Sequence, residues 1–188
     1  PWNNVLSWDF EKPEIRWFDG AELNITENCI DRHLSSKASQ TAILFEPNDP
    51  NEQAQHISYA ELSQQVNKMS NVLKSQGVCK GDRVCIYLPM IPELAYTVLA
   101  CARIGAIHSV VFAGFSASAL SSRINDCDAK IVVTADGSFR GAKTIDLKAI
   151  VDKALEESPQ VETVLVAERI HNRSEERRVG KECRSRWS

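Results

Sequence analysis

Two cations flank a glycine in a short segment that follows a β-branched run. Arg140 and Lys143 stand on either side of Gly141 and Ala142, shortly after residues 131–134. Arginine offers a planar fork of donors and lysine a mobile point charge, and a glycine lets backbone come close to a ligand. Because ligands of open α/β sheets bind beyond the carboxyl ends of strands, the segment predicts a site for an anion such as a phosphate. The open alternative is a solvated turn.

A second turn that could share this ligand follows another predicted strand. Phe112, Ala113 and Gly114 lie between a strand pattern over 106–112 and a helix pattern over 116–127. If both strands belong to one parallel sheet, both turns meet at the same edge. The flat face of Phe112 and the open backbone at Gly114 could then hold a base while the cations hold phosphates. The alternative is that Phe112 is ordinary core and Gly114 an ordinary turn.

The elements that must position these turns alternate between strand and helix patterns. Strands are predicted over residues 83–88, 106–112, 130–134 and 161–167, and helices over 92–104, 116–127 and 146–157. Such alternation is typical of a mostly parallel sheet covered by helices on both faces. The predicted fold class is therefore α/β.

The region before residue 83 contains elements of a different kind. Residues 1–22 are rich in aromatic side chains without a clean period, which predicts an irregular segment that packs against a larger body. A short helix is predicted over 24–37, and a strand pair over 41–46 and 56–59. Ser58 and Glu61 have the spacing of a capping box. The helix that they begin has an apolar stripe, formed by Leu62, Val66, Met69 and Leu73.

Composition and cysteine spacing exclude several classes of protein. Apolar residues make up 43% of the chain and charged residues 25%, as in globular proteins, and no apolar run approaches the length of a membrane span. The six cysteines include no CxxC pair and the four histidines are scattered, so no metal site is predicted. Free thiols are expected in a reducing compartment, which favours the cytoplasm.

Residues 173–188 differ in composition from the rest of the chain. They are strongly basic and contain Trp187, whereas the first 172 residues are net acidic. A basic arm for nucleic acid and a frayed end are two interpretations. The segment also resembles the conceptual translation of a DNA-sequencing adapter, so it is interpreted as a non-native tail and set apart from function. No nucleic-acid partner is expected, because the remaining chain is acidic.

The ordered motifs resemble those of AMP-forming acetyl-coenzyme A synthetases. The matching stretches are residues 17–20 (WFDG), 28–33 (NCIDRH), 87–93 (YLPMIPE), 105–116 (GAIHSVVFAGFS), 138–143 and 145–148. The similarity runs essentially from Pro1 to Arg169 and rests on the order of these matches. It implies an incomplete N-terminal domain of an adenylate-forming enzyme, with residues 1–40 as its N-terminal segment and 41–172 as part of the AMP- and CoA-binding α/β domain.

The resemblance also implies a reaction and a set of ligand contacts. Such enzymes join acetate to ATP, release pyrophosphate, and pass the acetyl group to coenzyme A, with release of AMP. The implied contacts to the 3′-phospho-ADP end of coenzyme A come from Arg140, Gly141, Ala142 and Lys143, and those to its adenine from Phe112, Ala113, Gly114 and Ile145. The family often has glycine at the positions of Ala113 and Ala142, and the added methyl groups narrow the approach there.

Several parts that the resemblance would require have no counterpart in the sequence. The phosphate loop for ATP, the magnesium ligands and a catalytic lysine are not found, so no catalytic or metal-binding residue is assigned and the chain alone is expected to be inactive. Acetate, ATP, magnesium and coenzyme A are the implied substrates and cofactor of the full-length enzyme. A synthetase for propionate or another short-chain acid, and a non-catalytic module that binds coenzyme A or another nucleotide, are the alternatives.

Overall fold

The centre of the molecule is a parallel β-sheet. The computed structural model describes residues 2–49, 51–141 and 143–170. Within them, four strands pair in the order β10-β7-β5-β6, and every neighbouring pair is parallel. The strands are β5 (Arg83–Tyr87), β6 (Ile107–Val110), β7 (Ile131–Ala135) and β10 (Thr163–Ala167). The predicted α/β class with a mostly parallel sheet is confirmed.

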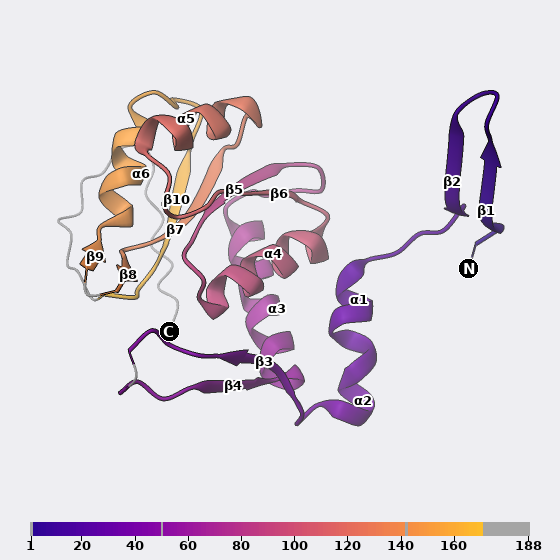
Figure 1. Cartoon of the computed structure of the whole chain (residues 1–188), viewed down its shortest axis with the longest axis horizontal. Coiled ribbons are helices and arrows are strands. Elements are labelled where there is room, and N and C mark those ends of the chain that lie inside the picture. Colours follow the sequence, from indigo (N-terminus) through magenta and orange to yellow (C-terminus); the bar gives the residue numbers. More distant parts are fainter. Residues whose placement is uncertain (1, 50, 142, 171–188) are drawn as a thin grey trace.

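Helices join successive strands of the sheet and cover it. They are α4 (Pro92–Ile104) between β5 and β6, α5 (Ala117–Asp126) between β6 and β7, and α6 (Leu147–Leu155) between β7 and β10. Helix α5 packs on α6, and α4 packs on α3 (Tyr59–Ser75). Figure 1 shows these two pairs on opposite sides of the sheet. Each connection therefore returns the chain to the same edge, so that the loops after the strands gather there.

Short-range signals set the ends of these helices. The Oγ of Ser58 accepts the Glu61 amide at 3.2 Å, and the Ser58 amide donates to the Glu61 carboxylate at 2.8 Å. This is the capping box predicted from the spacing. Helix α4 begins at Pro92 and ends before Gly105, as predicted. The stripe on α3 is buried as part of the core and consists of Leu62, Val66, Met69 and Leu73.

The N-terminal region differs from the prediction. Residues expected to be irregular form an antiparallel hairpin of β1 (Asn4–Asp9) and β2 (Glu14–Asp19), which Figure 1 shows beside rather than against the sheet. Its aromatic side chains are not packed anchors, since Trp8 and Phe10 are 60% and 82% exposed. The two strands do alternate, since the register puts Leu6, Trp8, Ile15 and Trp17 on one face and Ser7, Asp9, Glu14 and Arg16 on the other. The further aromatic residues Phe10 and Phe18 obscure this period in the sequence.

The short helix predicted over 24–37 is present in pieces. They are α1 (Ile25–Cys29), a 3₁₀ turn (Asp31–His33) and α2 (Leu34–Lys37). Asn24 caps α1, because its Oδ1 accepts the Thr26 backbone amide at 3.1 Å. The predicted strand pair is confirmed as β3 (Thr41–Phe45) and β4 (Gln55–Ser58), which run antiparallel.

Burial of two thiols predicts a selective chemical reactivity. Desolvation raises the pKa of Cys85 and of Cys101 to about 12, whereas Cys29 and Cys79 are exposed. At about pH 8 we expect iodoacetamide to modify Cys29 and Cys79 in the native chain, and Cys85 and Cys101 only after unfolding, because the thiolate is the nucleophile. Peptide mapping by mass spectrometry measures this. Native labelling of Cys85 as fast as that of Cys79 would contradict the burial.

Candidate functional site

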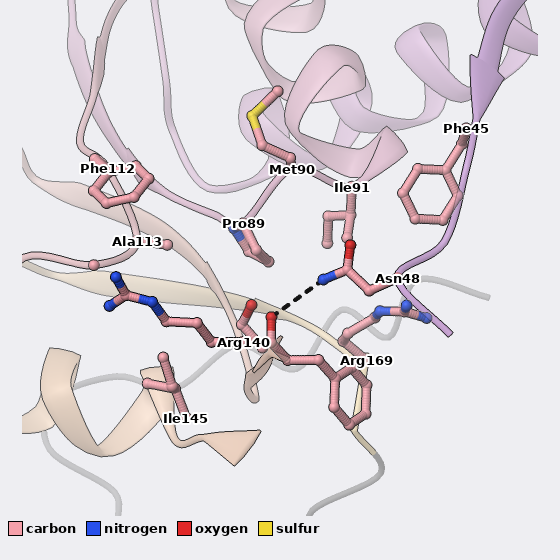
Figure 2. A pocket seen from close by; sticks show the side chains of 13 residues that line it. Phe45, Asn48, Pro89, Met90, Ile91, Phe112, Ala113, Arg140, Ile145 and Arg169 are labelled. Atoms are coloured by element: carbon pink, nitrogen blue, oxygen red, sulfur yellow. Dashed lines mark hydrogen bonds between the residues drawn. The ribbon is translucent and has the colours of Figure 1, made fainter. Parts of the chain in front are cut away.

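A pocket of about 290 Å³ lies at the edge of the sheet where the parallel strands end. Figure 2 shows that its walls come from segments far apart in the sequence. They are Phe45 and Asn48 near β3, Pro89, Met90 and Ile91 after β5, Phe112, Ala113 and Gly114 after β6, Ser138, Phe139, Arg140 and Ile145 after β7, and Arg169 after β10. The two turns singled out from the sequence thus meet in one pocket.

Side-chain hydrogen bonds hold the strand ends below this pocket. The hydroxyl of Thr134, at the end of β7, donates to the Tyr87 carbonyl at 2.9 Å. The Tyr87 hydroxyl in turn donates to the Phe115 carbonyl at 2.8 Å. Thr134 and Tyr87 have no exposed surface, so these bonds form where water does not compete. The ends of β5 and β7 and the turn after β6 are thereby linked.

The segment with the two cations is a hairpin rather than a simple turn before a helix. Strands β8 (Ser138–Arg140) and β9 (Lys143–Ile145) pair antiparallel between β7 and α6. Each strand has only three residues, too few for alternation to show in the sequence. Gly141 lies at the tip with φ at 59°, a backbone conformation that glycine adopts without strain. Ala142, also assigned to the site, lies outside the described residues.

The hairpin places the two cations directly opposite each other. Arg140 and Lys143 are register partners, so their side chains leave the same face of the hairpin. Like charges in such a pair repel each other, and neither side chain forms an ion pair with another described residue. An anion between them would relieve this repulsion. Arg140 lines the pocket, whereas Lys143 and Gly141 are not among its lining residues.

On the side of the turn after β6, the pocket has an aromatic wall formed by Phe112. Its side chain is 66% exposed, so the alternative that it is ordinary core is wrong. A Cβ added to Gly114 would lie 2.4 Å from Phe112 Cε1, which shows that the ring rests against the glycine backbone. The Phe115 ring contacts it edge-on at 5.9 Å between centroids. An exposed ring in this position offers a flat surface to a planar apolar partner.

Ile145, which the resemblance places beside the adenine of coenzyme A, lines the pocket from β9. The predicted set therefore divides: Arg140, Phe112, Ala113, Gly114 and Ile145 meet around one cavity, and Gly141 and Lys143 lie on the hairpin beside it. Among residues 2–49, 51–141 and 143–170, no group of three or more histidine, cysteine, aspartate or glutamate side chains could hold a metal ion. No helix in this part of the chain is long and apolar enough to span a membrane.

Sequence reasoning missed several residues of the pocket. Arg169 follows β10, so the rule that ligands bind beyond strand ends could have found it. Pro89, Met90 and Ile91 lie in a stretch noted only for its resemblance. Asn48 comes from the loop between β3 and β4, and nothing local indicates that this antiparallel pair reaches the pocket.

Comparison with known proteins identifies the family. A family model described as AMP-binding enzyme matches residues 30–186. The chain belongs to this family of AMP-binding enzymes. A second model, the acetyl-coenzyme A synthetase N-terminus, matches residues 1–29. The interpretation of residues 173–188 as a non-native tail stays a prediction, and these residues lie outside the described part of the chain.

Relatives of this AMP-binding chain are acetyl-coenzyme A synthetases. The one from Saccharophagus degradans is 56% identical over 169 residues, which are 90% of this chain and 26% of that protein. The one from Rhodobacter capsulatus is 61% identical over 157 residues, 82% of this chain and 24% of that protein. The resemblance to acetyl-coenzyme A synthetases is thus confirmed, and the chain spans about a quarter of the length of these curated relatives.

A solved structure has the same fold over most of the chain. Acetoacetyl-CoA synthetase from Streptomyces lividans superposes with a TM-score of 0.82 and 28% identity, over 93% of this chain and 26% of that one. The sheet and the helices that cover it therefore belong to an architecture that this synthetase shares.

An added methyl group is expected to affect stability differently at Gly114 and at Gly137. In Gly114→Ala the new Cβ meets only the exposed Phe112 ring, which can swing away, so we expect the stability to change by no more than about 0.5 kcal/mol. In Gly137→Ala it would lie 2.8 Å from the Ile145 carbonyl oxygen, which is backbone, so we expect a loss of roughly 1–3 kcal/mol. Thermal unfolding of the two variants measures this. A Gly114→Ala variant less stable than Gly137→Ala would contradict the packing described.

Proposed function

We propose that the pocket binds the 3′-phospho-ADP end of coenzyme A. The observation that supports this most strongly is the opposed pair Arg140 and Lys143: Arg140 lines the pocket, and neither cation forms an ion pair with another described residue. Arginine to phosphate contacts are charge-assisted and strong. The exposed face of Phe112 and the backbone at Gly114, from the turn after β6, and the side chain of Ile145, from the same hairpin as the cations, suit a purine.

We further propose that the chain forms the N-terminal quarter of an AMP-forming acetate–CoA ligase. The match of residues 1–29 to the acetyl-coenzyme A synthetase N-terminus and the matches to whole acetyl-coenzyme A synthetases over 82–90% of the chain support this. In the proposed reaction the acetate carboxylate attacks the α-phosphorus of ATP, and pyrophosphate leaves. The coenzyme A thiolate then attacks the carbonyl carbon of acetyl-adenylate, and AMP leaves. A cytoplasmic location accompanies this proposal, since the exposed thiols of Cys29 and Cys79 suit a reducing compartment.

The proposed role of this part of the enzyme is to hold the carrier rather than to react with it. The nucleotide end of coenzyme A is remote from its thiol, so the pocket would orient the thioester carrier and leave the bond changes to other residues. The described residues offer no cluster that fits magnesium. We therefore place the ATP site, its magnesium ion and the catalytic residues outside them.

The charge pair predicts the effect of removing one cation. We expect Arg140→Met to weaken coenzyme A binding by about tenfold or more, because a hydrogen bond to a charged group contributes about 1.5–3 kcal/mol. Arg16→Met is the matched control, since Arg16 is an exposed arginine of the N-terminal hairpin that pairs only with Glu14. Isothermal titration calorimetry with coenzyme A measures both. Equal affinities for Arg140→Met and the unmodified chain would contradict the proposed site.

The reaction itself is tested with the full-length gene product. We expect it to form AMP and acetyl-CoA in equal amounts from acetate, ATP and coenzyme A, and the present chain alone to form neither. Side-by-side assays with propionate and acetoacetate test the acid. Faster turnover of either acid would overturn the assignment to acetate but not the assignment to AMP-forming acid–CoA ligases. If no AMP formed with any of the three acids, both assignments would be overturned.

A further inference from the structure

Arg169 connects three parts of the pocket wall that are distant in the sequence. Its guanidinium binds the Glu52 carboxylate through both Nη atoms, at 3.0 and 3.3 Å. The same group lies 5.5 Å from the centroid of the Phe139 ring and 5.9 Å from that of Phe45. Both distances are within the range of a cation–π contact. Arg169 follows β10, Phe139 belongs to β8, and Phe45 and Glu52 belong to β3 and to the loop after it.

The backbone of Arg169 is fixed to the base of the β8–β9 hairpin. The Asp136 carboxylate accepts the Arg169 amide at 2.7 Å and the Gly137 amide at 2.8 Å. Asp136 is only 6% exposed, so these charge-assisted bonds are shielded from water. A Cβ on Gly137 would collide with the Ile145 carbonyl, which shows how closely the backbone segments approach at this point. The backbone from which the Arg169 side chain extends is thus held in place by Asp136.

The outer part of strand β8 is held from the same direction. The side-chain amide of Asn48 donates from Nδ2 to the Phe139 carbonyl at 3.4 Å, which is the dashed line in Figure 2. Phe139 directly precedes Arg140, and successive side chains of a strand point to opposite faces. Arg169 and Phe139 therefore pack on one face of β8, and Arg140 leaves the other. Figure 2 shows the Arg140 and Arg169 side chains extending in opposite directions.

We propose that Arg169 is a positioning residue that clamps β8 and so holds Arg140 over the pocket. This proposal rests on the proposed function, in which Arg140 binds a phosphate of coenzyme A. Without the clamp, the hairpin of two three-residue strands would depend on the Asn48 bond and on the Asp136 bonds at its base, and such short hairpins are marginally stable alone. If β8 were mobile in the free protein, it would lose conformational entropy each time the ligand binds, and this would lower the affinity for coenzyme A.

Removing the charge of Glu52 distinguishes a positioning role of Arg169 from direct binding of the ligand by Arg169. Both Nη atoms of Arg169 face the Glu52 carboxylate, so the charge that could attract a phosphate is already compensated. If Arg169 bound the ligand itself, removing the Glu52 charge would free that cation and strengthen binding. If Arg169 acts by clamping the hairpin, removing the same charge loosens the clamp and weakens binding.

The experiment measures the KM for coenzyme A, the KM for ATP and kcat in the full-length gene product. The variants are Arg169→Met, Arg169→Lys, Glu52→Gln and Arg140→Met, with Arg83→Met as the matched control because the Arg83–Asp128 ion pair lies at the opposite end of the sheet. We expect Arg169→Met to raise the KM for coenzyme A about tenfold and Glu52→Gln about threefold, with kcat and the KM for ATP unchanged. Arg169→Lys restores part of the loss, because a cation still lies over the two rings.

Each other outcome has a definite meaning. An unchanged KM for coenzyme A in Arg140→Met overturns the proposed function. If the KM for coenzyme A rises in Arg140→Met but not in Arg169→Met, only the positioning role of Arg169 is overturned. A Glu52→Gln variant that binds coenzyme A as well as or better than the unmodified protein, while Arg169→Met binds worse, makes Arg169 a direct ligand. A parallel rise in the KM for ATP, with a lower melting temperature that Arg169→Lys does not restore, assigns Arg169 to general stability.

Discussion

The pocket depends on the hydrogen bonds that join the carboxyl ends of the parallel strands. The Thr134 hydroxyl bonds the Tyr87 carbonyl, and the Tyr87 hydroxyl bonds the Phe115 carbonyl. A buried donor that loses its acceptor costs about 1–3 kcal/mol, so these groups resist any slip of β7 relative to β5. Because the turn with Phe112 and the hairpin with Arg140 extend directly from these ends, their separation across the pocket is set by buried, water-free contacts.

The cations around the pocket serve different purposes. Arg140 and Lys143 repel each other across the strand pair, and an anion between them would turn that repulsion into binding energy. Arg169 is already neutralised by Glu52 and is placed on the aromatic side of the strand. One charge of the pocket is thus kept available for a ligand while the other is used in packing. The net acidic character of residues 1–172 does not oppose this, since the sign that matters is local.

Much of the frame could be predicted from sequence because it follows local rules. Helix α4 has the predicted bounds, between Pro92 and Gly105, and the Ser58 cap fixes the start of α3. The β8–β9 hairpin could not be predicted, since three-residue strands show no period. The partners of Arg169 could not be predicted either, because Glu52 is 117 residues away and only the folded chain brings the two together. The N-terminal hairpin was missed because Phe10 and Phe18 obscure the alternation of its two strands.

An experimental structure of the protein with coenzyme A tests the central claim most directly. The account predicts a phosphate group of the ligand within hydrogen-bond distance of the Arg140 guanidinium, on the side shared with Lys143, and the adenine against the face of Phe112. Coenzyme A bound elsewhere, with Arg140 in contact only with solvent and Phe112 turned into the empty pocket, would contradict it.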